Sequence, residues 1–312
     1  MQMETAPVPV QQERAEQLTG SDVVVALAQF APKLGDVGAN LERHLSILED
    51  AAEGGAHLVV FPELSLTGYF LWDLVPEVAL RRDSPELESI AGASERVDAV
   101  VGCVLESEDA RFYNAALYFS GGRLHHVHRK VYLPTYGLFD EARYFAPGDR
   151  FEAFKAPLPA SHPRRAWDAG MLVCEDLWHP SAPVALSWQG VEMFLCPCAS
   201  PGRGVMRGAA LGSERSYDHM TRTYAQLFTS YLVFCNRIGY EDGIAFWGGS
   251  RVIGPDGALI GEAAGSNEAL IFHRLDLAAV RRSRIHNPLL RDERHDINAA
   301  QANRLWRRPA RD

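Results

Sequence analysis

The chain has 312 residues, of which 47% are hydrophobic and 23% are charged, a composition typical of one large soluble globular domain. Its net charge of −9 excludes the basic surface that nucleic-acid phosphates require. No apolar run approaches the ~20 residues that cross a bilayer, and residues 1–21 lack the apolar core of a secretory signal. We therefore expect a flexible N-terminal arm over residues 1–21, a cytoplasmic location, and neither a nucleic-acid nor a membrane partner.

The first third of the chain has the pattern of a β–α–β unit. A β-rich run over residues 23–30 precedes a helix over 40–53, which Asn40 can cap, and a second apolar run follows over 57–61. Strands joined through a helix in this way are parallel neighbours in one sheet. Ser84-Pro85 then opens a short helix, with proline in its favoured first position.

The rest of the chain combines further β–α–β units with antiparallel hairpins. We predict turns at residues 121–122 and 255–257, a long loop over 134–149, helices after Pro180 and over 213–229, and strands over 100–105, 112–119, 124–131, 170–174, 191–196, 232–236, 251–254, 259–262 and 269–275. This alternation predicts one α/β domain over residues 22–280, with mixed sheets packed between outer helices.

Residues 281–312 form an Arg-rich C-terminal tail, with nine arginines against four acids. A tail of this kind either lies on a neighbouring subunit or is solvated, and the charge pattern favours neither. No linker or repeat between the arm and this tail marks a second domain.

The five cysteines predict reduced thiols, because their number is odd and most of them lie in or near apolar runs. Cys196 and Cys198 flank a proline, but no second pair completes the four ligands of a zinc site. The metalloprotease, P-loop and dinucleotide-binding motifs are also missing from the sequence. We predict that the protein uses no metal and no cofactor.

Three stretches place a reactive side chain just past an apolar strand. Glu63 follows Phe61-Pro62, Lys130 is the last but one residue of the run over 124–131, and Cys174 is the last residue of the run over 170–174. In α/β folds the strand ends aim side chains into a shared crevice. A cysteine attacks a carbonyl as its thiolate, so Lys130 could supply a cation and Glu63 could accept the proton. The backbone N–H of Glu175 could hold the oxyanion.

The acids that follow Cys174 bear on the same question. Glu175 and Asp176 would raise the pKa of the thiol if their charges faced the sulfur. A catalytic Cys174 would therefore need the compensating cation that Lys130 provides.

In order, spacing and flanking residues, these stretches resemble the nitrilase superfamily, the carbon–nitrogen hydrolases with a Glu–Lys–Cys triad, and the resemblance runs from about residue 23 to about residue 275. It implies an α/β four-layer α-β-β-α sandwich with two mixed sheets, and a homodimer or higher homo-oligomer. It also implies that Glu63 is the general base, that Lys130 stabilises the oxyanion, and that Cys174 is the nucleophile. Glu141 matches a second glutamate that the family often carries after the lysine.

Within the superfamily, three segments look most similar to the glutamine-hydrolysing domain of glutamine-dependent NAD synthetases. They are residues 129–137 (RKVYLPTYG), 174–180 (CEDLWHP) and 199–201 (ASP). Two features depart from that pattern. The printed sequence stops where a synthetase domain would begin, and Cys196-Pro197-Cys198 stands where polar residues are usual.

We predict that the protein hydrolyses a non-peptide C–N bond of a small amide through a Cys174 thioester, releasing ammonia or an amine. Residues near the three motifs are candidates to contact the substrate: Tyr69, Tyr136, Trp178, Ser200 and Arg203. Arg203 or Arg207 could pair with a substrate carboxylate.

Other functions remain open at this point. The same triad would serve a glutaminase that supplies ammonia to a partner synthetase, or a nitrilase that acts on nitriles. A Cys–His hydrolase could use His179 or His128, although the sequence places no Asn or Asp to orient either imidazole. A non-catalytic binding protein on the same scaffold is a fourth alternative.

Overall fold

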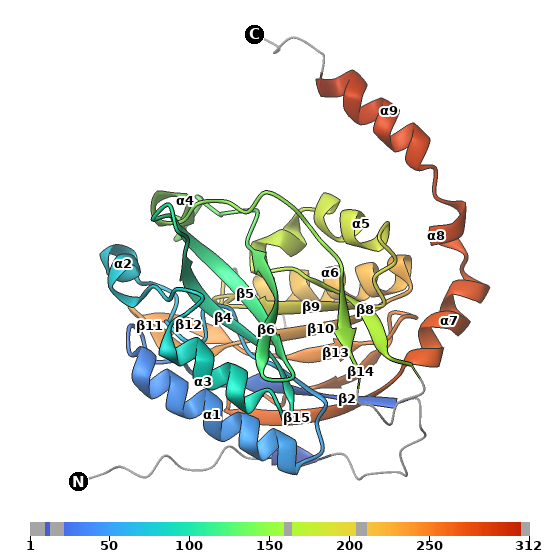
Figure 1. Ribbon diagram of the computed structural model, residues 1–312. Coiled ribbons are helices and arrows are strands. Elements are labelled where there is room, and N and C mark those ends of the chain that lie inside the picture. The colour runs from blue at the N-terminus through green and yellow to red at the C-terminus, as the bar shows by residue number, and fades with distance from the viewer. Residues whose placement is uncertain (1–9, 13–21, 159–163, 204–210, 307–312) are drawn as a thin grey trace.

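The computed structural model describes residues 10–12, 22–158, 164–203 and 211–306 (Figure 1). Its strands are β1 (Val10–Gln12), β2 (Asp22–Gln29), β3 (Leu58–Val60), β4 (Asp98–Glu106), β5 (Phe112–Ser120), β6 (Arg123–Arg129), β7 (Phe154–Pro157), β8 (Ala166–Met171), β9 (Met193–Cys198), β10 (Tyr231–Asn236), β11 (Ile238–Glu241), β12 (Ile244–Trp247), β13 (Arg251–Ile253), β14 (Leu259–Glu262) and β15 (Ala269–Asp276). Its helices are α1 (Val37–Glu53), η1 (Trp72–Leu74), α2 (Val75–Val78), α3 (Pro85–Ala93), α4 (Glu141–Tyr144), η2 (Cys174–Trp178), α5 (Ser181–Ser187), α6 (Gly212–Phe228), α7 (Leu277–His286), α8 (Leu289–Asp292) and α9 (His295–Trp306).

Two mixed sheets form the centre of the molecule. One has the order β1-β15-β2-β3-β4-β5-β6 and the other β14-β13-β10-β9-β8-β7. The β2–β3–β4 and β8–β9–β10 pairings are parallel, and hairpin-connected strands at the edges are antiparallel. A third, two-stranded sheet pairs β11 with β12.

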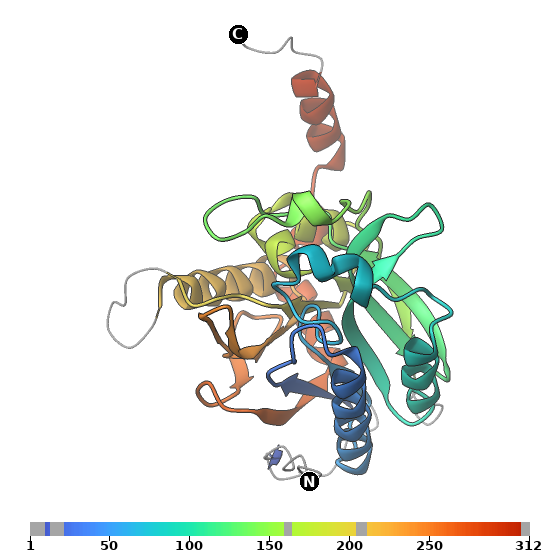
Figure 2. The same cartoon turned by 90° about the vertical axis from the view of Figure 1, so that its left-hand side faces the viewer.

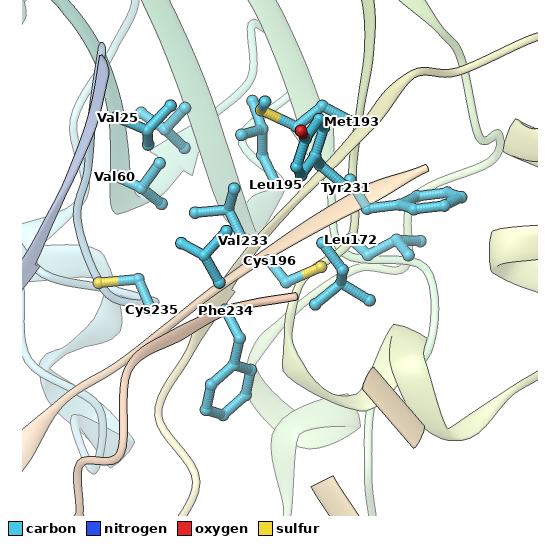
Figure 3. Packing of buried hydrophobic residues seen from close by; sticks show 14 of the residues in the cluster. Val25, Val60, Leu172, Met193, Leu195, Cys196, Tyr231, Val233, Phe234 and Cys235 are labelled. Atoms are coloured by element: carbon cyan, nitrogen blue, oxygen red, sulfur yellow. The ribbon is translucent and has the colours of Figure 1, made fainter. Parts of the chain in front are cut away.

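The inner core lies between the two large sheets, as the side chains in Figure 3 show. Val25 and Leu27 of β2 point into it, whereas Ala26 and Ala28 belong to a second cluster with Ile47 of α1. Alternate residues of one strand therefore serve two cores, because side chains alternate faces along a strand. The layers run α-β-β-α, with α1 and α3 outside the first sheet and α6 outside the second, which confirms the predicted sandwich (Figure 1).

Helix α1 begins three residues earlier than predicted. Asp36 is its N-cap, and Asp36 Oδ1 accepts a hydrogen bond from Ala39 N at 3.0 Å. The predicted cap, Asn40, is instead buried inside the first turn, where its amide group bonds the backbone of Lys33 and of Leu66. Asn40 therefore connects two loops. Asp36, the nearest carboxylate upstream, caps the helix in its place.

Several boundaries differ from those predicted. The strand expected over residues 170–174 ends at Met171, and Cys174 opens the 3₁₀ helix η2. The short strands β7, β11 and β12 were not predicted, and within the expected N-terminal arm Val10–Gln12 pairs with β15. The Arg-rich tail holds α8, α9 and most of α7, and Figure 2 shows α9 standing clear of the sandwich. Within the described ranges, no helix is long and apolar enough to span a membrane.

Candidate active site

Glu63 lies in a tight turn after β3, where Leu64 adopts a positive φ of 50°. This turn packs directly on Gly102 of β4, because a Cβ at Gly102 would lie 2.4 Å from Leu64 N. Glu63 Oε1 accepts hydrogen bonds from Asn114 Nδ2 and Lys130 Nζ, both at 2.7 Å. Glu63 Oε2 accepts from Ala199 N at 2.8 Å. Three donors thus bond this buried carboxylate, which can accept about four hydrogen bonds. They hold it in one orientation.

Lys130 follows β6, and its side chain is fully buried. Its Nζ donates to Glu63 Oε1 and to Glu141 Oε1, each at 2.7 Å. Burial by itself disfavours the ammonium, but the charges of Glu141, Glu63 and Cys174 outweigh it and raise the pKa of Lys130 above its ordinary value. The side chain therefore remains a cation at neutral pH.

Glu141 begins the short helix α4 and completes this cluster. Its Oε1 accepts from Lys130 Nζ and from Tyr69 Oη, whereas its Oε2 is buried and has no hydrogen-bond partner in the described part of the chain. Burial raises the pKa of Glu141 to about 7, a rise that Lys130 opposes and Glu63 reinforces. A free buried carboxylate oxygen next to an ammonium is an acceptor available to a ligand.

Cys174 stands at the first position of η2 with a φ of 45°, a conformation that costs energy for a residue with a side chain. Its side chain is 6% exposed. Within the described residues, its Sγ makes no hydrogen bond to Glu63 or Lys130, and it lies 3.3 Å from Tyr217 Oη. The sulfur nevertheless lies near enough to the cluster for its charge to act on Lys130 and on Tyr69.

Asp176 links the Cys174 turn to the Lys130 strand. Its Oδ2 accepts from Val173 N and from His128 Nε2, both at 2.9 Å. Its Oδ1 accepts from the backbone N–H groups of Val131 and Tyr132 at 3.1 and 3.0 Å. The carboxylate therefore sits between two strand ends and fixes their separation.

This geometry corrects one statement made from the sequence, since Asp176 does orient an imidazole, that of His128. The Cys–His alternative nevertheless lacks the hydrogen bond between histidine and sulfur that it requires. His179 stacks on Tyr132 with ring centroids 3.6 Å apart, and in the described residues neither histidine bonds the sulfur.

A pocket opens over Cys174, and every predicted contact residue that the structure describes lines it. It is lined by Tyr69, Pro134, Tyr136, Phe139, Cys174, Glu175, Trp178, Ser200, Pro201, Arg203, Ser213 and Tyr217. The predicted Arg207 lies outside the described residues. Ser200 is held by a residue outside this lining, since its Oγ accepts a hydrogen bond from Trp247 Nε1 at 3.1 Å.

The mouth of this pocket carries one charge of each sign. Tyr136 Oη donates to both carboxylate oxygens of Glu175 at 3.0 Å, so this carboxylate faces Tyr136. Burial raises the pKa of Glu175, and the bond from Tyr136 opposes that rise. The Arg203 guanidinium lies 5.3 Å from the ring centroid of Tyr136 and 4.9 Å from that of Phe139. Stacking on two rings holds this cation at the opening.

Sequence reasoning missed Asn114, Ser213 and Tyr217. Asn114 had a signal, because it is a polar residue in the interior of an otherwise apolar strand. Tyr217 had none, since its contact with Cys174 arises only when α6 packs on the second sheet. In the described ranges no group of three metal-binding side chains occurs, and Cys196 and Cys198 are both fully buried in β9.

Comparison with known proteins adds independent information. A family model described as carbon-nitrogen hydrolase matches residues 24–285. The glutamine-dependent NAD(+) synthetase of Thermotoga maritima is 33% identical over 292 residues, which cover 90% of this chain and 47% of that protein. The corresponding enzyme of Acinetobacter baylyi is 30% identical over 264 residues, covering 84% and 46%. This chain thus spans about half the length of these relatives.

Solved structures agree with this result. A glutamine-dependent NAD+ synthetase from Acinetobacter baumannii has a TM-score of 0.71 at 28% identity, covering 83% of this chain and 46% of the other. A carbon-nitrogen hydrolase from Helicobacter pylori has a TM-score of 0.75 at 24% identity, covering 93% of this chain and 99% of the other. At that lower identity the likeness describes the fold alone.

Proposed function

This chain belongs to the carbon–nitrogen hydrolase family, and we propose that it cleaves the C–N bond of a small amide with Cys174 as nucleophile. One observation carries the proposal. A fully buried Lys130 bridges two carboxylates, Glu63 and Glu141, beside a pocket whose wall includes Cys174. Burying three charges is costly unless they pair with one another. A cation between two acids beside a strained cysteine is an arrangement that suits acyl transfer.

The first half of the proposed reaction forms a thioester. Glu63 takes the proton of the Cys174 thiol, and the sulfur attacks the amide carbon. Lys130 and the backbone N–H of Glu175 stabilise the resulting oxyanion, and loss of one such donor typically costs about 10²–10³ in rate. Glu63 then gives its proton to the nitrogen, the C–N bond breaks, and ammonia or an amine leaves.

The second half regenerates the enzyme. Glu63 removes a proton from water, which attacks the thioester carbon, and the C–S bond breaks. The products are a carboxylic acid and the restored thiol, which recovers its proton from Glu63. Glu141 has a separate role in this scheme: its free Oε2 accepts an N–H of the substrate amide and directs the nitrogen toward Glu63.

Intact mass spectrometry after incubation with a panel of small primary amides tests this proposal. We expect an acyl adduct on the wild-type chain and none on Cys174→Ala, together with loss of turnover in that variant. Cys103 belongs to the second cluster, between the first sheet and its outer helices, so Cys103→Ala should behave like wild type. Full turnover by Cys174→Ala would end the proposal.

A second candidate is a glutaminase that supplies ammonia to a partner synthetase. Two observations favour it: the relatives named above are glutamine-dependent, and the pocket mouth carries both Arg203 and Glu175. A cation and an anion in the lining of one pocket match the carboxylate and ammonium of a free amino acid.

Steady-state kinetics with matched amides separates these functions. A glutaminase should prefer glutamine over butyramide, and Arg203→Met should raise KM for glutamine while leaving KM for butyramide unchanged. Equal use of both amides by wild type would favour a general amidase. Acid production from a nitrile, at a rate comparable to that from the amide, would instead favour the nitrilase alternative.

A further inference from the structure

Tyr217 places its hydroxyl within hydrogen-bonding distance of the proposed nucleophile. It lies on α6, is 2% exposed, and places its Oη 3.3 Å from Cys174 Sγ. Its ring is fixed from two sides. Phe234 lies 5.0 Å away at a tilt of 40°, and Trp178 lies 5.6 Å away, edge to face at 83°.

The direction of the Tyr217 hydrogen bond follows from its second partner. Trp178 Nε1 lies 3.1 Å from Tyr217 Oη, and an indole N–H can only donate. The phenol oxygen therefore accepts from Trp178, and its own proton remains free for another acceptor. Cys174 Sγ is the other hydrogen-bond partner of this oxygen in the described residues. Once the sulfur is a thiolate it can only accept, so the contact is then Oη–H···S⁻.

We propose that Tyr217 is a catalytic residue that donates a hydrogen bond to the Cys174 sulfur, and that Trp178 is a positioning residue that directs the phenol proton. This inference rests on the proposed function, in which sulfur carries negative charge twice per turnover. The first occasion precedes attack on the amide carbon. The second follows hydrolysis, when the C–S bond breaks and its electron pair returns to sulfur. The phenol proton stays on Oη throughout, so no proton is gained or lost.

The surroundings of Tyr217 suit a donor that keeps its proton. Burial, together with the neighbouring Cys174 and Cys198, raises the pKa of Tyr217 well above its ordinary value. The hydroxyl thus remains protonated at neutral pH. A hydrogen bond to a charged acceptor is also stronger than one to the neutral thiol, so the contact favours the ionised sulfur.

The rate of Cys174 alkylation by iodoacetamide, measured against pH on the native protein, tests this role without any substrate. The other four cysteines are 0% exposed, so the reagent reports on Cys174. We expect Tyr217→Phe to move the midpoint of the alkylation profile up by about one pH unit and to lower kcat by about tenfold. Trp178→Phe should shift the midpoint in the same direction by less.

Tyr224→Phe is the matched control, because Tyr224 lies on the same helix and stacks on Phe228 away from the sulfur. It should leave both the alkylation profile and kcat unchanged. If Tyr217→Phe does not fold, as thermal unfolding would reveal, the Trp178→Phe profile decides. An unshifted midpoint in the folded variants overturns the proposal, even if kcat falls. Turnover by Cys174→Ala, by contrast, would overturn the proposed function. The alkylation profile is measured without substrate, so it would still show whether Tyr217 bonds the Cys174 sulfur.

Discussion

Lys130 is the side chain on which the buried cluster depends. It balances two carboxylates that would otherwise be buried without a cation, and loss of one partner of a buried ion pair typically costs about 3–5 kcal/mol. We therefore expect Lys130→Met to lower the free energy of unfolding by about that amount at pH 8, as measured by urea denaturation. The loss should shrink at lower pH, because the orphaned carboxylates can then bind protons.

Lys155→Met is the control for this prediction. Lys155 pairs with Asp168 at 2.7 Å, but its side chain is 70% exposed. An exposed pair contributes at most about 1 kcal/mol, so this variant should unfold almost like wild type. Equal stability of the two variants would show that the buried cluster is not charged in the way described.

Glu141 should give the reaction an acid limb near neutral pH. Its pKa is raised to about 7, chiefly by burial, so the carboxyl binds a proton as the pH falls through that value. Protonation of Glu141 removes one of the two negative charges that lie beside the Lys130 ammonium. We expect kcat/KM to fall as the pH drops through about 7, and Glu141→Gln to show a lower plateau without that limb. A limb at the same pH in Glu141→Gln would assign it to another group.

At the scale of elements, the contact between β4 and the Glu63 turn fixes the position of that turn. A Cβ at Gly102 would lie 2.6 Å from Pro62 O and 2.9 Å from the carbonyl carbon of Glu63, so the turn must move to admit it. We expect Gly102→Ala to destabilise the protein by about 1–3 kcal/mol. It should also lower kcat/KM by at least about tenfold, since even a small displacement of catalytic groups is costly.

Gly92→Ala is the matched change at a site with no such contact. Gly92 lies in α3, and a Cβ there meets nothing within 4 Å. Alanine in a helix is favoured over glycine by about 0.5–1 kcal/mol, so this variant should be slightly more stable and fully active. Full activity in Gly102→Ala would show that the turn tolerates a shift.

The elements differ in how much of them the sequence predicts. Long apolar strands such as β2, β4 and β10 were predicted because burial on both faces leaves a continuous apolar run. The hairpin β11–β12 was not, since its strands have four residues each and depend on tertiary contacts. Arg237 and Glu241 form a buried ion pair there, and Glu241 accepts from the backbone of Tyr69 and Phe70. A sequence alone assigns such charges to the surface.

The site shows the same division. Glu63, Lys130 and Cys174 could be singled out as candidates because each lies at the end of a predicted strand. The strands before Glu63 and Lys130 belong to one sheet and the strand before Cys174 to the other, so their approach depends on how the two sheets pack. The contact of Tyr217 with the sulfur could not be predicted, because it depends on how α6 rotates against the second sheet. Helix periodicity predicts which face is buried, and does not say which single atom that face reaches.

At the scale of the whole molecule, α9 leaves large apolar side chains uncovered. Trp306 is 89% exposed and Leu305 61%, and the helix stands away from the sandwich (Figure 2). Residues 281–312 carry a net charge of +5 from nine arginines and four acids, so the rest of a chain of −9 carries −14. Exposed apolar side chains in a basic segment beside an acidic body favour docking on a second copy of the chain.

Light scattering after size-exclusion chromatography tests this expectation. The full chain should form a dimer or larger oligomer, and Trp306→Ala should shift it toward smaller species, more strongly at high salt. Tyr240→Ala removes an aromatic side chain of similar exposure, 77%, from a different surface and should leave the mass unchanged. A monomeric full chain would contradict the expectation.

The place of β15 in the first sheet has a consequence for synthesis in the cell. β15 pairs along its whole length with β2, and Gln29 at the end of β2 donates to the carbonyl of Asn267, 238 positions later. While the ribosome is still extending the chain, β2 is an apolar strand with an open edge, a template for mispairing between nascent polypeptides. Expression should therefore depend on chaperones that shield this edge until translation has passed residue 276.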